Sequence, residues 1–199
     1  LTLVYFPRKT TAVVDLKSTM SFMIQKMVTT ERDCKARLVP AGNPTVIPEG
    51  EFVNITQELG GNYTVTWRGN MYRIDGTDAG AIGRKAMTLT FDAPEDGNIS
   101  EQQVWDALET IFDPEIPINL VSLGLIYKVD IDQASGDVNI DMTLTAPGCG
   151  MGPVLVGDVE YRVAMVPHVK NVNVELVFDP AWSRDMMSEE AQLEAGLFF

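Results

Sequence analysis

The sequence has few of the residues from which metal sites and many active sites are built. Its 199 residues include two cysteines, Cys34 and Cys149, and one histidine, His168. A secreted disulfide scaffold would carry more cysteines, and these three residues cannot supply a four-ligand zinc site. A Gly-rich phosphate loop, a Cys-x-x-Cys pair and a Ser–His–Asp set are also missing, which argues against kinase, thioredoxin and hydrolase functions.

Basic residues are scarce as well. The chain has 15 Lys and Arg against 28 Asp and Glu, so its formal net charge is −13. Such a surface repels phosphate backbones and anionic lipids, which predicts no nucleic-acid and no membrane partner. No segment approaches the roughly 18 apolar residues of a transmembrane helix, and no secretory signal is recognised, so we expect a cytoplasmic protein. The acidic surface keeps the protein soluble, or it favours binding to basic patches on partner proteins.

Apolar patterning predicts a first folded part near the N-terminus. Residues 28–91 are expected to form a small all-β domain, because strand-like alternation, as in 63–67, recurs between Gly- and Pro-containing turns. Residues 92–99 are polar and rich in Pro, Gly and Asp, which is typical of a linker. Residues 1–27 are interpreted as an extension, since the chain does not begin with Met and methionines follow downstream.

Residues 100–199 are predicted to fold as an αββαβ domain. One helix begins after Ser100, whose hydroxyl can cap its first turn with Gln103 three residues on, and a second begins at Pro153. Alternating apolar residues predict two hairpin strands between the helices and a third strand after them (125–131, 138–144 and 172–178). The fold class is therefore α+β: a small all-β domain, then a domain with helices packed on a small sheet.

The most unusual segment is 145–153, which joins a strand to a helix and holds three glycines around Cys149. A helix N-terminus presents unpaired N–H groups and a positive partial charge, which stabilise a nearby thiolate. A thiolate is the form that binds soft metals, so Cys149 is the candidate metal ligand. The alternative is that Cys149 is a small buried apolar residue and the glycines only form a tight turn. Cys34 lacks this setting and is predicted to be structural.

Two carboxylates follow the first helix of this domain. Asp113 and Glu115 belong to the segment Asp-Pro-Glu-Ile-Pro, which by composition alone is a helix stop followed by a stiff loop. In an αββαβ layer this loop and the Cys149 loop could meet at one end of the sheet. The carboxylates would then offer hard ligands for iron, or proton acceptors, beside a thiol. His168 is predicted to lie in a surface loop.

Several segments of the chain are similar to a known family. They include both loops and continue beyond the last strand: DPEIP (113–117), LGLIY (123–127), MTLTAPGC (142–149), VFDPAW (177–182) and RDMMS (184–188). These segments resemble the metal–sulfur cluster assembly domain shared by cytosolic iron–sulfur targeting factors and the PaaD proteins. Upstream, RDC (32–34) and QELGGNYTV (57–65) are similar to the N-terminal domain of SufT-type proteins.

The resemblance implies an auxiliary, non-catalytic role in iron–sulfur cluster assembly, with Cys149 as the family cysteine and Asp113, Glu115 and Thr145 lining the same pocket. The implied cofactor is a transient iron ion or iron–sulfur cluster, and the implied partners are assembly carriers and client apoproteins. One cysteine cannot enclose a cluster, so a homodimer, a small thiol or a client would complete its ligands. Two alternatives remain: a PaaD-like assembly factor for one multisubunit oxygenase, and a thiol-dependent enzyme.

Overall fold

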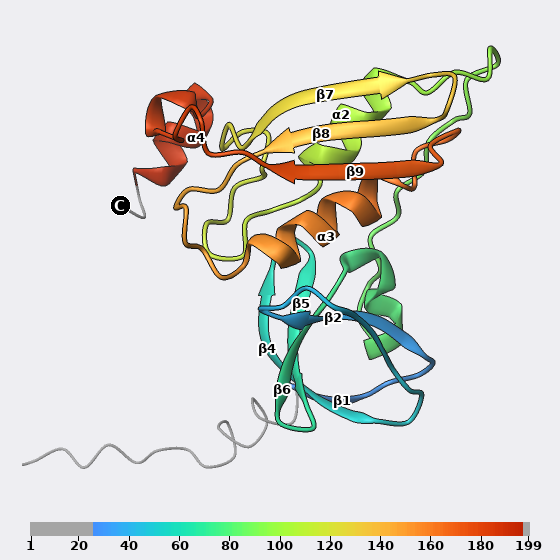
Figure 1. The fold of residues 1–199 in the computed structure, drawn as a ribbon. Coiled ribbons are helices and arrows are strands. Elements are labelled where there is room, and N and C mark those ends of the chain that lie inside the picture. Colours follow the sequence, from blue (N-terminus) through green and yellow to red (C-terminus); the bar gives the residue numbers. More distant parts are fainter. Residues whose placement is uncertain (1–25, 197–199) are drawn as a thin grey trace, which may run out of the picture.

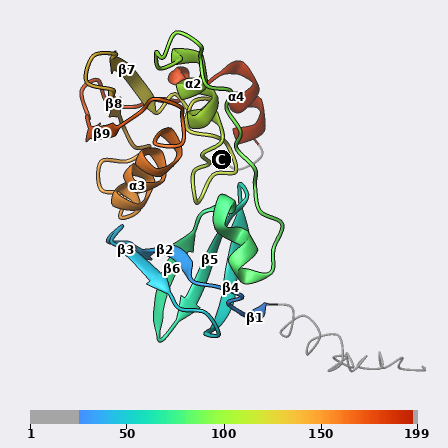
Figure 2. The same ribbon diagram turned by 90° about the vertical axis from the view of Figure 1, so that its right-hand side faces the viewer.

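Two β-sheets and several helices form the described part of the chain, residues 26–196, in the computed structural model (Figures 1 and 2). The first sheet is antiparallel throughout, and its six strands are β1 (Met27–Thr29), β2 (Cys34–Val39), β3 (Pro44–Ile47), β4 (Phe52–Leu59), β5 (Asn62–Trp67) and β6 (Asn70–Ile74). Their order across the sheet is β1-β4-β5-β6-β2-β3. Met27, assigned to the predicted extension, belongs to β1, whereas residues 1–25 lie outside the described residues.

The predicted all-β region also contains a helical segment, the 3-10 helix η1 (Gly76–Ile82). Asp75 caps it, because its carboxylate accepts a hydrogen bond from the Thr77 amide at 2.9 Å. Ala79, Ala81 and Ile82 of η1 are buried in the same core as the strands. The prediction that residues 28–91 are entirely β is therefore wrong for this segment, which is too short and too rich in Gly and Ala to show a helical period.

The second sheet carries the predicted αββαβ order. The elements are α2 (Glu101–Glu109), β7 (Ile126–Asp132), β8 (Asp137–Met142), α3 (Gly152–Val163) and β9 (Asn171–Leu176). β8 is central, antiparallel to β7 and parallel to β9. Figure 2 shows both helices on one face of this sheet. The Ser100 hydroxyl caps α2 as predicted, accepting from the Gln103 amide at 3.4 Å. η2 (Arg184–Met186) and α4 (Glu189–Ala195) close the chain.

The described residues form two separate apolar cores, one in each sheet region. The second core includes the predicted apolar stripe of α3, in which Leu155, Val159 and Val163 are buried in the same cluster as Ile140 and Met142 of β8. Residues between η1 and α2 form no helix or strand, and the predicted linker lies among them. The exact domain boundaries stay a prediction. No helix within residues 26–196 is long and apolar enough to cross a membrane.

The side of α3 that faces away from its sheet packs on the first sheet region (Figures 1 and 2). Arg73 of β6 donates to Asp158 of α3 at 2.8 Å, and both side chains are buried. Burial raises the pKa of Asp158, and the Arg73 guanidinium opposes that shift. One helical turn on, the buried Arg162 donates to Asp75 at 2.7 Å. Two buried ion pairs therefore join α3 to the N-terminal sheet region.

Candidate functional site

The Cys149 loop (residues 145–151) runs from the end of β8 to the start of α3. Two backbone hydrogen bonds shape it: the Cys149 amide donates to Ala146 O at 3.1 Å, and the Gly152 amide donates to Cys149 O at 3.2 Å. α3 begins at Gly152, with Pro153 in its first turn as predicted and no side chain capping it. The strand, two successive tight turns and the helix therefore fix where the Cys149 main chain lies.

The three glycines near Cys149 have different roles. Gly148 and Gly150 are exposed; a Cβ on Gly148 would meet nothing within 4 Å, and one on Gly150 would meet only Pro40, at 3.9 Å. Gly152 is buried, and a Cβ there would lie 3.0 Å from the Leu144 side chain. Of the three glycines only Gly152 is closely packed, and a side chain there would displace the end of Leu144 by a few tenths of an ångström. The open space around the other two leaves the main chain beside Cys149 accessible to a partner or ligand.

The two cysteines differ sharply in their surroundings. Cys149 is half-buried, with one side packed against the second apolar core. Cys34, the first residue of β2, is 0% exposed. Burial, together with the nearby Asp78 carboxylate, raises the pKa of Cys34 to about 12. Its environment bears out the prediction that Cys34 is structural, because a buried, protonated thiol is inert.

Asp113 serves the structure of its own loop. It is buried, and its carboxylate accepts hydrogen bonds from the amides of Glu115 at 2.8 Å and Ile116 at 2.9 Å. This geometry matches the helix stop and stiff loop that composition alone indicates. Glu115 is exposed. Its carboxylate is therefore the more accessible of the two.

Thr145 is half-buried at the start of the Cys149 loop. Within residues 26–196, no hydrogen bond or ion pair links Thr145, Asp113 or Glu115 to Cys149, and no three His, Cys, Asp or Glu side chains gather as metal ligands would. The grouping of these four residues into one site stays a prediction. His168 is exposed in the loop before β9, as expected.

A feature that the sequence did not reveal is the packing of the β2–β3 turn against the start of α3, next to the Cys149 loop. The turn between β2 and β3 reaches the start of α3, where Gly42, with φ of +74°, packs so tightly that a Cβ would lie 2.5 Å from Pro153 O. Pro40 in the same turn approaches Gly150. Residues of β2 farther from the turn, Lys35 and Arg37, line a pocket with Tyr161 of α3. No sequence signal could have joined these residues, because more than a hundred positions separate β2 from α3.

Comparison with known proteins gives consistent matches over about half of the chain. A family described as "Iron-sulfur cluster assembly protein" matches residues 101–176. The "Fe-S protein maturation auxiliary factor" of Porphyromonas gingivalis is 48% identical over 97 residues, which cover 49% of this chain and 91% of that protein. The "Fe-S protein maturation auxiliary factor YitW" of Bacillus subtilis is 40% identical, and the match covers 49% of this chain and 94% of that protein. The "Fe-S protein maturation auxiliary factor SufT" of Staphylococcus aureus is 41% identical, and the match covers 44% of this chain and 98% of that protein.

The three relatives are thus little longer than the segment they share with this chain. The family match begins at the first residue of α2 and ends at the last residue of β9. It therefore covers the αββαβ region and the Cys149 loop and leaves out β1 to β6. The similarity of segments 32–34 and 57–65 to SufT-type proteins stays a prediction.

Proposed function

Because the chain belongs to the iron–sulfur cluster assembly protein family, we propose that it is a non-catalytic auxiliary factor that matures iron–sulfur client proteins through Cys149. A role in iron–sulfur assembly or maturation follows from the membership itself. The part played by Cys149, and the partners it meets, make up the proposal. The partners are carriers of the assembly pathway and the client apoproteins that receive the cluster.

The observation that carries the proposal is the contrast between the two thiols. Cys149 is half-buried in an exposed loop beside open space, whereas Cys34 is fully buried with a pKa of about 12. Thiolate sulfur is the ligand that iron–sulfur clusters take from proteins. Of the two cysteine thiols, only that of Cys149 can bind an iron centre without unfolding of its surroundings.

The number of ligands shapes how Cys149 would act. Clusters of two or four irons are held by four protein ligands, and Cys149 supplies one of them. An iron ion or cluster handled at this loop is therefore cargo, shared with a carrier, a client, a small thiol or a second copy of the chain. Incomplete ligation suits a transfer role, because the cargo can pass to a protein that offers more thiolates.

A pull-down from cells grown with limiting iron tests the proposal. The tagged wild-type protein should capture iron–sulfur carriers or client apoproteins, and Cys149→Ser should lose most of this capture, because a serine hydroxyl stays protonated and is a hard ligand. Cys34→Ala, which removes the buried thiol, is the control and should capture the same proteins as wild type. Equal capture by Cys149→Ser and wild type would show that the partners are held elsewhere on the surface.

A further inference from the structure

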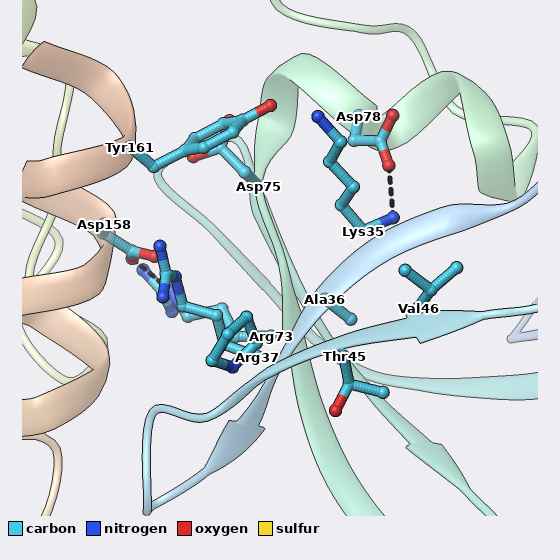
Figure 3. Close-up of a pocket in the computed structure, with 11 residues that line it drawn as sticks. Lys35, Ala36, Arg37, Thr45, Val46, Arg73, Asp75, Asp78, Asp158 and Tyr161 are labelled. Carbon is cyan, nitrogen blue, oxygen red and sulfur yellow. Dashed lines mark hydrogen bonds and ion pairs between the residues drawn. The ribbon is translucent and has the colours of Figure 1, made fainter. Parts of the chain in front are cut away.

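A pocket of about 390 Å³ lies between β2, β3, the start of η1 and the side of α3 that faces the first sheet (Figure 3). Its polar wall holds Lys35, Arg37 and Arg73 from the first sheet and Asp158 and Tyr161 from α3. Ala36, Pro44 and Val46 supply an apolar wall. Pockets that bind small molecules begin at about 300 Å³ and combine an apolar lining with a few polar groups. The size and lining of this pocket fit that class.

Each carboxylate in the pocket already has a cationic partner. Asp158 pairs with Arg73 at 2.8 Å, and Asp75 pairs with Arg162 at 2.7 Å. Asp78 pairs with Arg32 at 2.6 Å and also accepts a hydrogen bond from the Lys35 amide at 2.7 Å. The negative charges that line the pocket are therefore neutralised within the protein.

Two cations of the pocket have no such partner. Arg37 donates to the Gly157 carbonyl at 2.7 Å, and within residues 26–196 no carboxylate forms an ion pair with it. Lys35 likewise lacks an ion pair in this part of the chain, and its ammonium lies 5.9 Å from the centre of the Tyr161 ring. Arg37 also acts electrostatically on the Asp158 carboxylate. The five cations at the pocket and paired with it (Arg32, Lys35, Arg37, Arg73 and Arg162) nevertheless outnumber its three carboxylates by two, although the chain as a whole carries a net charge of −13.

We propose that this pocket binds a small organic anion, with its carboxylate or phosphate group at Lys35 and Arg37 and its apolar part between Tyr161 and Val46. Arg and Lys are the side chains that bind carboxylates and phosphates by charge-assisted hydrogen bonds. The Tyr161 ring and the apolar wall offer contact to the rest of such a ligand. A neutral ligand would leave both cations unpaired, and a cationic one would be repelled.

The pocket is lined by residues of both the first sheet and α3. Lys35 and Arg37 come from β2, whereas Tyr161 comes from α3, so a bound anion would contact both (Figure 3). The hairpin of β2 and β3 that forms one wall also carries the turn that covers the start of α3. This site is separate from Cys149, and its existence does not depend on what Cys149 does.

Titration of the full chain with benzoate, phenyl phosphate and benzamide, followed by ¹⁵N-resolved NMR, tests the proposal. Benzoate, phenyl phosphate or both should shift the amides of Lys35, Arg37 and Tyr161 in a saturable way. Benzamide, which has the same ring without the charge, should bind with an affinity at least about tenfold lower, because a charge-assisted hydrogen bond is lost. The arm that binds more tightly identifies the ligand as a carboxylate or a phosphate.

Two variants distinguish anion binding in the pocket from nonspecific electrostatic attraction to the surface. Lys35→Met keeps a long unbranched side chain but removes its charge, and it should weaken binding of the anion about tenfold. Lys85→Met makes the same change at an exposed lysine outside the pocket and should leave binding unchanged. No saturable shifts with either anion, equal binding of benzamide, or wild-type binding by Lys35→Met would each overturn the proposal.

Discussion

Iodoacetamide will alkylate Cys149 at least about a hundredfold faster than Cys34 in the folded protein at neutral pH. The attacking species is the thiolate, and a pKa of about 12 leaves only a minute fraction of Cys34 ionised. Cys34 is also 0% exposed, so the reagent reaches it only when β2 opens. Cys149 is half-buried in an exposed loop and needs no such opening. Mass spectrometry of peptides after timed quenching gives both rates.

Unfolding provides the control for this comparison. In concentrated urea both cysteines are exposed, and their rates should converge to within a few-fold, because the environment that protects Cys34 is lost. Comparable labelling rates in the folded protein would contradict the account, since Cys149 would then have no advantage as the sulfur that meets a partner.

Replacement of Arg162 by methionine will lower the free energy of unfolding by about 3–5 kcal/mol, the cost of removing one partner of a buried ion pair. The Arg162 side chain is 0% exposed and donates to Asp75 at 2.7 Å, Thr110 at 2.8 Å and Asn62 at 3.2 Å. Methionine fills much of the space but leaves the Asp75 carboxylate without its cation. Urea unfolding followed by circular dichroism measures the change.

A surface ion pair serves as the matched control. Arg68 and Glu51 are also 2.7 Å apart, but the side chain of Arg68 is 66% exposed, so Arg68→Met should change the stability little. The double variant Arg162→Met/Asp75→Asn removes both buried charges and should recover part of the loss. Wild-type stability in Arg162→Met would contradict the description of the Arg162–Asp75 pair as one of the two that join α3 to the N-terminal sheet region.

The sequence predicted best those elements whose residues alternate or repeat. The period-2 pattern of β8 and the apolar stripe of α3 each place one set of residues in the core, and Ile140, Val159 and Val163 are buried as expected. The Cys149 loop was also predicted as a strand-to-helix connection. The alternation of β8 and the Pro at the start of α3 fix its two ends independently of the rest of the chain.

The packing of the two regions could not be predicted. Asp158 and Arg162 lie four residues apart on α3, a spacing at which opposite charges can pair along one helix face. In the structure each binds a different residue of the N-terminal sheet region, Arg73 and Asp75 respectively, and both are buried. Only the tertiary contact shows that this face of α3 is covered. The pocket at Lys35 and Tyr161 was missed for the same reason.

The role of Asp113 shows a similar limit. Its sequence context is compatible with a metal ligand and with a loop-forming residue, because both uses need a carboxylate oxygen that can donate an electron pair. The hydrogen bonds from the Glu115 and Ile116 amides occupy Oδ1. Only the folded loop reveals that local structure engages this oxygen.

The central claim is that the thiol of Cys149 is needed for iron–sulfur maturation, and enzyme activity in cells tests it most directly. Cells that lack the protein are supplied, at native expression and with limiting iron, with wild type, Cys149→Ser or Cys34→Ala. Cys149→Ser changes little volume at a half-buried position, so it should melt at the wild-type temperature. Wild type and Cys34→Ala should restore the activity of iron–sulfur enzymes, and Cys149→Ser should leave it at the level of the deletion. Full restoration by Cys149→Ser would contradict the account and reduce Cys149 to a packing residue.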